Sequence, residues 1–487
     1  PACGSGSFLI GAYTFLLDWH RDWYHDDGPE KHTNEIYQGA GGMWHLATRK
    51  KKEILLKNIF GVDIDSQAVE VTKLNLLMKL LEGENQNTLD RQFKLFHERA
   101  LPDLSSNIKC GNSLIGPDFY HGQQLAMFDE EERYRINAFD WHAEFPDVFK
   151  NGGFDAVIGN PPYIRVSNVA ENQRSYLYRR YDLTHRFDIY IAFIARGFGL
   201  LRSPGCFGFI VPNKFITAHY GTGLRGLLTA KNAISAIVDF GDSQVFDGPT
   251  TYTCLLFLTR DGTAQFEYLQ ARADTACAMW YAGDSISIKT STLSEAPWPL
   301  VRDTHRVILD RISVFPRLNH YCTISRGLET GYDDIFLLED AGPGKDTESQ
   351  VIVRSKAEAE PFPIEREAAR RVVKGSVDVR RYFIEKPHRW VLFPYEHRPA
   401  GPALIDSRQY PKRFPLAWAY LQRHSKELHS RKGDRWYAYR RRNYDLAEGT
   451  ERLLVPSIAQ RASFAYESTG TIHYVGSGGG GGGGYGL

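Results

Sequence analysis

The chain has 487 residues, more than one ordinary domain contains, so we expect two or more domains. Hydrophobic residues make up 42% of it and charged residues 24%, which is typical of a globular protein. The net charge of +1 does not by itself indicate a nucleic-acid partner, and no stretch approaches the roughly 18 apolar residues of a membrane span, so no membrane partner is expected.

Six cysteines occur singly, and no two of them form a Cys-x-x-Cys pair. This usage argues against a zinc ribbon and against a disulfide framework, and it predicts a reducing, cytoplasmic environment. The chain begins with Pro1, runs straight into a glycine turn, and closes in a run of glycines. Because a strand is expected before such a turn, we interpret the sequence as an interior piece of a longer protein whose first strand is missing.

Strand and helix patterns alternate over the first half of the chain. A helix is predicted at residues 8–19, and an apolar strand at 59–63 precedes a helix at 68–81. The apolar residues that share one side of this second helix are Val71, Leu74, Leu77, Met78 and Leu81. Further strands are predicted at 154–159, 207–211, 234–240 and 253–258, with a helix at 187–201. The alternation predicts an α/β fold with a Rossmann-like, doubly wound, mostly parallel sheet, in which ligands bind at the carboxyl ends of the strands.

Two polar features in the first part of the chain are suited to a ligand. The turn at residues 1–6, Pro-Ala-Cys-Gly-Ser-Gly, opens the first predicted helix. Its glycines would let the backbone approach a ligand closely, although a purely structural turn explains it equally well. Asp63 ends the strand at 59–63, where a carboxylate can accept both hydroxyls of a ribose. The alternative role, capping the next helix, suits Asp65 or Ser66 better.

The strongest motif follows the strand at 154–159. It reads Asn160-Pro161-Pro162-Tyr163, and its two prolines stiffen the turn and carry no amide hydrogens. The Asn160 side-chain oxygen and the Pro161 carbonyl are therefore predicted to accept the two protons of an exocyclic amino group. Two such acceptors would free the nitrogen lone pair to attack a methylsulfonium. Tyr163 offers a flat face for a planar base.

Together, these motifs resemble the gamma-class amino-methyltransferases, and more specifically the methylase and target-recognition part of Type IIG restriction–modification enzymes. The resemblance covers about residues 1–260 for catalysis. It implies a class I methyltransferase domain that uses S-adenosyl-L-methionine and methylates N6 of a flipped-out adenine in double-stranded DNA. The reaction needs no metal. No Pro-Cys dipeptide occurs, which argues against the thiolate mechanism of cytosine C5 methylation.

The resemblance also implies residue roles. Asn112 matches the position beside the adenine of the cofactor, where an aspartate is more common. Phe246 is the implied second stacking partner of the flipped base, opposite Tyr163, with Tyr252 as second choice, although a core aromatic explains Phe246 about equally well. The complete implied cofactor set is Pro1, Ala2, Cys3, Gly4, Gly6, Asp63, Asn112 and Asn160.

The alternating pattern stops near residue 260. We predict a methyltransferase domain at 1–262, a connector at 263–314, and an α+β DNA target-recognition domain at 315–487 that is incomplete at its end. Basic and aromatic residues interleave from 410 to 444, which favours DNA contact over a solvated surface. The candidate DNA-binding residues are Arg435, Arg440, Arg441 and Arg442. The closing glycine run is interpreted either as part of this domain or as a flexible linker.

Other functions stay open at this point. RNA adenine or protein glutamine methyltransferases share the Asn-Pro-Pro-Tyr motif, N4-cytosine is a further target, and a catalytically silent DNA-binding subunit is a different class. The long basic and aromatic second half favours DNA. No Asp or Glu stands two positions before a Lys, so we expect no nuclease site here and place one in a missing N-terminal part of the polypeptide.

Overall fold

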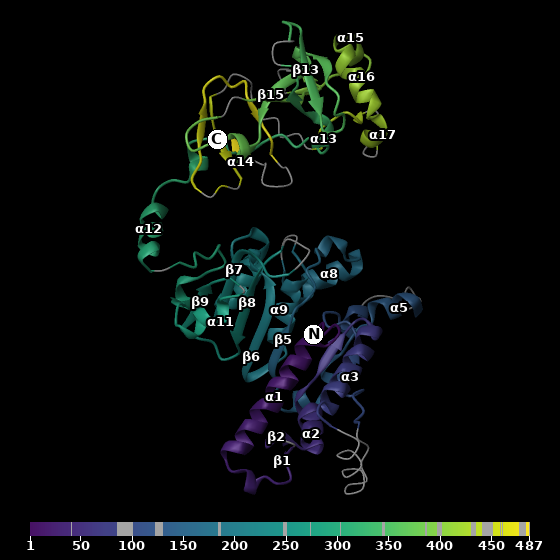
Figure 1. The fold of residues 1–487 in the computed structure, drawn as a ribbon, viewed down its shortest axis with the longest axis vertical. Helices are drawn as coiled ribbons and strands as arrows, with labels where there is room; N and C mark the ends of the chain where they lie inside the picture. The colour runs from purple at the N-terminus through teal and green to yellow at the C-terminus, as the bar shows by residue number, and fades with distance from the viewer. Residues whose placement is uncertain are drawn as a thin grey trace. The chain divides into compact units, whose positions relative to one another are not determined.

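The computed structural model describes residues 1–39, 41–84, 101–121, 130–183, 187–246, 251–272, 274–301, 303–342, 346–384, 387–396, 402–429, 435–440, 451–457, 459, 461–476 and 484–486. The chain divides into two compact units, Pro1–Leu309 and Asp310–Leu487 (Figure 1). None of the described helices combines the length and the apolar character that a bilayer span requires.

The first unit opens with a helical layer around two short parallel strands. The elements are α1 (Ser7–Asp26), β1 (Ile36–Gln38), β2 (Trp44–Leu46), α2 (Thr48–Asn58), β3 (Gly61–Asp63), α3 (Ser66–Leu81) and β4 (Ile108–Cys110). β3 and β4 pair in parallel, with Val62 opposite Lys109. Buried side chains of α1, α2 and α3, among them Tyr13, Leu55 and Leu76, form one core cluster.

Helix α3 confirms the predicted helix but not its predicted side. Leu76 and Leu80 are fully buried, whereas Leu74 and Met78 are 58% and 63% exposed. The physical reason is the glycine turn, because the Thr72 hydroxyl donates to the Gly4 carbonyl at 2.8 Å and so faces α3 toward the turn. Because the threonine side chain is small, α3 can approach the glycine turn closely at this position. The side of α3 that spacing alone predicted to be buried therefore lies on the surface.

A six-stranded sheet forms the rest of the first unit. Its strands are β5 (Phe154–Gly159), β6 (Leu201–Pro212), β7 (Ile234–Gln244), β8 (Tyr252–Thr259), β9 (Gln265–Gln270) and β10 (Ile286–Lys289), in the order β10-β9-β7-β8-β6-β5. β5, β6, β7 and β9 run in the same direction, and β8 and β10 run in the opposite one. The α/β class predicted from the sequence is confirmed, and the sheet is mixed because β8 lies antiparallel between β6 and β7.

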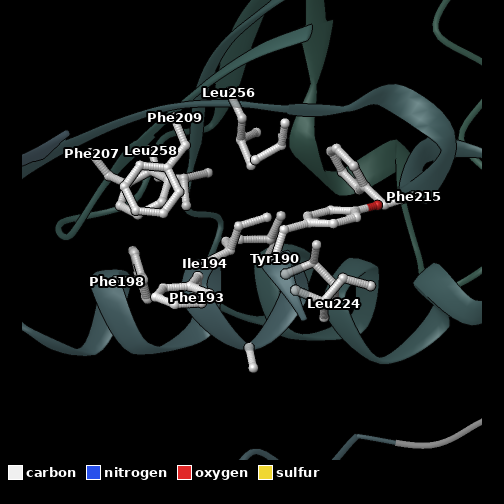
Figure 2. Close-up of a cluster of buried hydrophobic side chains, with 14 of the residues drawn as sticks. Tyr190, Phe193, Ile194, Phe198, Phe207, Phe209, Phe215, Leu224, Leu256 and Leu258 are labelled. Carbon is white, nitrogen blue, oxygen red and sulfur yellow. The ribbon is translucent and has the colours of Figure 1, made fainter. Parts of the chain in front are cut away.

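Helix α9 (Tyr190–Gly199) packs against this sheet through an apolar stripe (Figure 2). Tyr190, Ile194 and Phe198 recur every four residues on one side, and all are buried. The other helices described in this unit are α5 (Glu130–Ile136), α6 (Trp141–Glu144), α7 (Pro146–Lys150), α8 (Glu171–Arg180), α10 (Thr222–Ala230), α11 (Ala276–Tyr281) and α12 (Asp303–Ser313), which continues into the second unit.

An apolar groove separates the β3-β4 pair from the six-stranded sheet. Among the described residues, β3 pairs only with β4, and β5 pairs on one edge only, with β6. Gly61 of β3 and Ala156 and Ile158 of β5 line a cavity of about 610 Å³, which Phe8 and Phe15 of α1 also border. The groove therefore lies between β3 and β5, which do not pair with each other.

The predicted connector needs correction. The sequence placed it at 263–314, but β9 and β10 occupy 265–289 and continue the six-stranded sheet. Their pairing explains the difference, since Ile237 of β7 lies in register with Tyr268 of β9. The alternation of strand and helix had stopped in this region. The successive strands β8, β9 and β10 reverse direction each time, and strands that alternate in direction can extend a sheet without the crossover that successive parallel strands need.

The second unit contains a six-stranded sheet, a four-stranded sheet, the antiparallel pair β17-β18 and several short helices. One sheet has the order β14-β13-β12-β16-β15-β21 and the other β11-β22-β19-β20. The strands are β11 (Ser325–Arg326), β12 (Leu337–Asp340), β13 (Gln350–Ser355), β14 (Phe362–Glu365), β15 (Ala369–Val373), β16 (Arg389–Leu392), β17 (Tyr395–Glu396), β18 (Ala403–Leu404), β19 (Arg452–Pro456), β20 (Ala465–Glu467), β21 (His473–Tyr474) and β22 (Gly484–Gly486). The helices are α13 (Asp333–Phe336), α14 (Gly375–Asp378), α15 (Tyr410–Arg413), α16 (Pro415–Arg423) and α17 (Ser425–Leu428).

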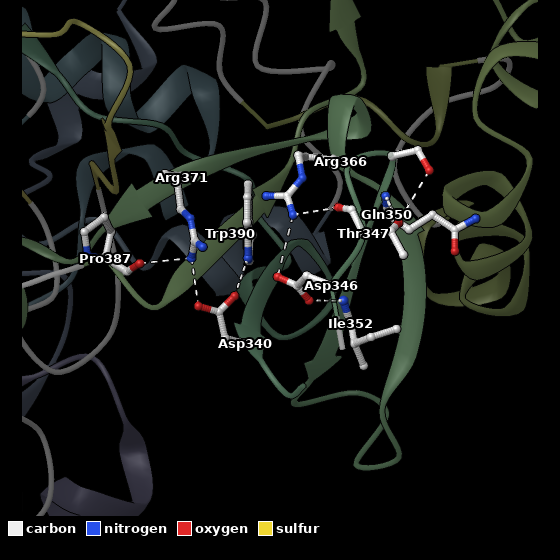
Figure 3. Close-up of polar contacts among 10 residues, drawn as sticks. Asp340, Asp346, Thr347, Gln350, Ile352, Arg366, Arg371, Pro387 and Trp390 are labelled. Atoms are coloured by element: carbon white, nitrogen blue, oxygen red, sulfur yellow. Dashed lines mark hydrogen bonds and ion pairs between the residues drawn. The ribbon is translucent and has the colours of Figure 1, made fainter. Parts of the chain in front are cut away.

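Polar contacts join neighbouring strands of the larger sheet (Figure 3). The Arg371 guanidinium lies 3.7 Å from the centre of the Trp390 ring and donates to Asp340 Oδ2 at 2.8 Å. The indole nitrogen of Trp390 donates to the other oxygen of Asp340. One carboxylate thus holds side chains from β15 and β16 to β12.

The end of the closing glycine run is a strand. β22 pairs antiparallel with β11 and with β19. A Cβ added at Gly486 would meet the Tyr474 hydroxyl at 2.7 Å, so only glycine fits this position without a shift. Residues 484–486 therefore belong to the fold of the second unit rather than to a linker.

Candidate active site

The turn at residues 1–6 is held to β3 and α3 by backbone contacts. The amide of Cys3 donates to the Val62 carbonyl at 3.1 Å. Gly4 and Gly6 both have positive φ angles, of 56° and 85°. A Cβ at Gly6 would meet Thr72 Cγ2 at 2.8 Å, whereas a Cβ at Gly4 would meet nothing within 4 Å. Gly6 thus allows close packing on α3, and Gly4 leaves open space for a ligand.

Asp63 lies at the carboxyl end of β3 and fixes the turn. Its Oδ2 accepts from the Gly4 amide at 2.8 Å, and its Oδ1 accepts from the Asp65 amide at 3.0 Å. A carboxylate offers about four acceptor positions, so about two remain for a ligand. The helix cap is a different residue, because the Asp65 side chain accepts from the Gln67 amide at 2.8 Å. The prediction that Asp65 or Ser66, rather than Asp63, would cap α3 is confirmed, and the cap is Asp65.

Asn112 follows β4. Its Oδ1 accepts from the Leu114 amide at 3.1 Å, and its own amide donates to the Asn137 carbonyl at 2.7 Å. These two hydrogen bonds fix the loop, and the side-chain oxygen is already occupied as the acceptor of the Leu114 amide. The side-chain NH₂ is the group that Asn112 can still offer to a ligand.

One cavity of about 500 Å³ brings these features together. It is lined by predicted residues from the glycine turn and from the ends of three strands, namely Ala2, Gly4, Asp63, Asn112, Asn160 and Pro162. Pro1 and Cys3 line the neighbouring groove between β3 and β5 instead, which Asn160 also borders. Gly6 lines neither cavity, because it packs against Thr72.

Several apolar residues of this cavity were not predicted. Ile64 and Ile164 each follow a predicted motif directly, and this position could have identified them. Gln173 and Leu177 belong to α8, a helix that the sequence analysis did not predict. Phe193 reaches the cavity from α9, where helical spacing alone indicates only a core residue.

The motif at 160–163 begins where β5 ends. Asn160 is exposed, Pro161 is buried, and Pro162 and Tyr163 are half-buried. The Tyr163 ring packs edge-on against Tyr190, with ring centres 6.1 Å apart at 78°. Its hydroxyl lies 2.8 Å from Asn160 Oδ1 and 3.1 Å from the Ile210 carbonyl oxygen. Burial raises the pKa of Tyr163 above the ordinary tyrosine value.

Phe246 lies close to the same part of the sheet. It is half-buried and packs against a small core cluster that contains Ile210, Val238 and Phe240. Tyr163 contacts Ile210 through its hydroxyl, so the two aromatic residues predicted to stack on a base share a neighbour. Tyr252, the second choice, is half-buried at the start of β8 opposite Gln244.

In the second unit, Arg435 and Arg440 are exposed, and Arg441 and Arg442 lie outside the described residues. Among the described aromatic residues of this segment, Tyr410, Tyr420 and Tyr437 are at most 1% exposed, and Trp418 and Trp436 are half-buried. Arg423 is held by Glu358 through two hydrogen bonds of 2.8 and 2.9 Å, and this pairing lowers the pKa of Glu358. The interleaved pattern is therefore a core of aromatics with cations on its surface, and not a set of stacking platforms.

Known proteins resemble this chain in sequence and in fold. Residues 57–246 match the family model described as Eco57I restriction-modification methylase. The chain is 26% identical over 503 residues to the Escherichia coli protein named Type II restriction enzyme and methyltransferase RM.Eco57I, which covers 98% of this chain and 47% of that protein. It is 25% identical over 276 residues to the Streptomyces coelicolor protein named adenine-specific methyltransferase PglX, covering 54% of this chain and 20% of that protein.

A solved structure shows the same fold. It is described as the Type IIL restriction-modification enzyme MmeI in complex with DNA. The match covers all of this chain and 56% of the MmeI chain, with a TM-score of 0.59 and 16% sequence identity. The chain spans about half the length of the Escherichia coli relative. The resemblance indicated by the sequence motifs, to the methylases of restriction–modification enzymes, is confirmed.

Proposed function

We propose that this chain is a site-specific DNA methyltransferase of a restriction–modification or phage-defence system. It transfers a methyl group from S-adenosyl-L-methionine to N6 of a flipped-out adenine. The observation that carries the proposal is the single cavity at the strand ends that Gly4, Asp63, Asn112 and Asn160 line together. Residues distant in sequence converge there, and this convergence supports the proposal.

The proposed architecture follows from the two units. The first is a Rossmann-like, doubly wound methyltransferase domain of class I, and the second is an α+β target-recognition domain. The parallel strands β5, β6, β7 and β9 support the first assignment. The groove between β3 and β5 supports the interpretation that a first strand of this sheet is missing.

The residues present fit the proposed cofactor. The open space above Gly4 suits the methionine part, and the spare acceptor positions of Asp63 suit ribose hydroxyls. The Asn112 NH₂ and the apolar surface of Ile64 suit a purine ring. When bound, the cofactor supplies an electrophilic methyl group.

The chain's own groups activate the target. The Asn160 side-chain oxygen and the Pro161 carbonyl accept the two protons of the adenine amino group. Because neither proline carries an amide hydrogen, the backbone of the turn offers no donor at Pro161 or Pro162 to compete for these acceptors. Tyr163 and Phe246 stack on the base and offset the few kcal/mol that flipping it costs.

Adenine in double-stranded DNA is favoured over the alternatives. One relative is named adenine-specific, and the enzyme with the matching fold was solved in complex with DNA. The exposed Arg435 and Arg440 supply cations for phosphate contacts in the second unit. The Escherichia coli relative is named both restriction enzyme and methyltransferase, so we place a nuclease in an N-terminal part of the same polypeptide.

The test is transfer of a labelled methyl group from S-adenosyl-L-methionine to unmethylated genomic DNA, followed by nucleoside analysis. Label in N6-methyladenine is expected. Label in cytosine would change the target base, and label only in RNA or protein would replace the proposal with a methyltransferase for RNA adenine or protein glutamine. DNA binding without any transfer would indicate a silent DNA-binding subunit.

A further inference from the structure

The Tyr163 hydroxyl lies between two acceptors. Asn160 Oδ1 is 2.8 Å away and the Ile210 carbonyl oxygen is 3.1 Å away. β5 pairs with β6 only as far as Phe209, and the next carbonyl along β6, that of Ile210, accepts from Tyr163 instead of from a strand. A hydroxyl has one proton, so it cannot donate fully to both oxygens.

A half-turn of the Asn160 amide resolves this conflict. The oxygen and the NH₂ of an asparagine occupy nearly equivalent positions, and the torsion that exchanges them is broad. With the NH₂ toward Tyr163, Asn160 donates to the hydroxyl oxygen and the hydroxyl donates to Ile210. Each donor then has its own acceptor.

We propose that Tyr163 is a positioning residue, whose hydroxyl accepts from Asn160 Nδ2, donates to the Ile210 carbonyl, and thereby turns Asn160 Oδ1 toward the target amino group. This inference rests on the proposed function, because the amino group is the group that Oδ1 accepts from. If the hydroxyl donated to Oδ1 instead, it would compete with the substrate for the acceptor that the reaction needs.

Two features keep the hydroxyl in this role. The Tyr163 ring packs against Tyr190, which is fully buried, so the hydroxyl has a fixed position. Ile210 lies within β6, where it pairs with Leu255 of β8, so its carbonyl is rigid. Burial raises the pKa of Tyr163, and the hydroxyl therefore keeps its proton throughout the physiological range.

The decisive variant is Tyr163→Phe, which keeps the ring and removes the hydroxyl. We expect kcat to fall about tenfold, the effect of losing one hydrogen bond. KM for DNA and the dissociation constant of the cofactor should stay within twofold. The matched control is Tyr13→Phe in α1, away from the cavity. It removes a buried hydroxyl that donates to the Lys51 carbonyl of α2 at 2.9 Å. This control should leave kcat unchanged.

A second measurement does not depend on activity. NMR of selectively labelled asparagine side chains should show one Asn160 NH₂ proton that is shifted and slow to exchange in the wild type, and ordinary in Tyr163→Phe. An Asn160 signal that the substitution leaves unchanged would overturn the inference, even in a protein without methyl transfer. A second outcome would also overturn the inference. It is an equal fall in kcat for Tyr163→Phe and Tyr163→Ala together with failed base flipping in both variants, as read from a fluorescent adenine analogue in the DNA. A wild type that transfers no methyl group to DNA would overturn the proposed function alone.

Discussion

The cavity of the first unit that we propose binds the cofactor and the basic, aromatic segment of the second unit were both predicted from sequence, but from different kinds of signal. The cavity rested on residues at defined strand ends, and the structure brings Gly4, Asp63, Asn112 and Asn160 together. The segment at 410–444 was predicted from composition, and most of its described aromatic residues, Tyr410 and Tyr437 among them, are buried. A position relative to the backbone thus predicts a site, whereas composition does not distinguish a core from a binding surface.

The largest effect is expected for Asn160→Ala, which tests whether the residues at the strand ends form the active site. It removes the predicted acceptor and should lower methyl transfer by two orders of magnitude or more, about what one preorganised hydrogen-bonding group contributes to an active site. DNA binding should persist. The control is Asn151→Ala, since Asn151 is an exposed residue that only bonds the Asp147 carbonyl. Measurement is by labelled methyl transfer, and retained activity in Asn160→Ala would remove the assigned site.

The buried aromatics should affect stability rather than DNA recognition. Tyr437→Ala removes a side chain that is 1% exposed and whose hydroxyl donates to the Ile405 carbonyl. We expect a loss of about 3–5 kcal/mol in the free energy of unfolding, measured with denaturant. Tyr382→Ala, at a site 73% exposed, should cost less than about 0.5 kcal/mol. If the folded Tyr437→Ala protein lost DNA affinity without losing stability, the aromatic residue would have to be assigned to the interface.

Asp63→Ala should weaken binding of the cofactor more than it lowers the stability of the fold. It removes the acceptor of two backbone amides and the proposed ribose contact, so calorimetry should show the dissociation constant rising about 100-fold, or close to 3 kcal/mol. Asp65→Ala is the matched neighbour, and it should cost about 1 kcal/mol of stability through the lost helix cap. Similar cofactor affinity in the two variants would contradict the assignment of Asp63.

The smallest effect is expected for a surface cation. Arg435→Ala should weaken DNA binding severalfold at any sequence and lower the salt dependence by about one released ion. Stability should not change. Lys426→Ala, another exposed cation of the second unit, is the control for nonspecific charge. An unchanged salt slope in Arg435→Ala would place the DNA elsewhere on this unit.

The limits of the sequence prediction have physical causes. Asp63 and Asn160 could be identified because a strand, a turn and a polar residue coincide at each position. The exposed side of α3 was predicted wrongly because its apolar residues occur on more than one side, and the contact between Thr72 and Gly4 decides which side packs. The strands β9 and β10 were missed because they reverse direction along the chain and only the short helix α11 lies between them, so the regular strand-and-helix alternation does not extend to them. The direction of β8 was not predictable either, since a strand pattern reads the same in both senses.

The groove between β3 and β5 has a consequence for handling this chain. A strand edge that pairs with no described strand, beside an apolar wall that includes Phe8 and Phe15, is a template for strands of other molecules. We therefore expect concentration-dependent self-association of this chain, detectable by light scattering. A charged substitution on the wall, such as Phe15→Lys at a site 68% exposed, should raise its solubility without disturbing the cofactor cavity.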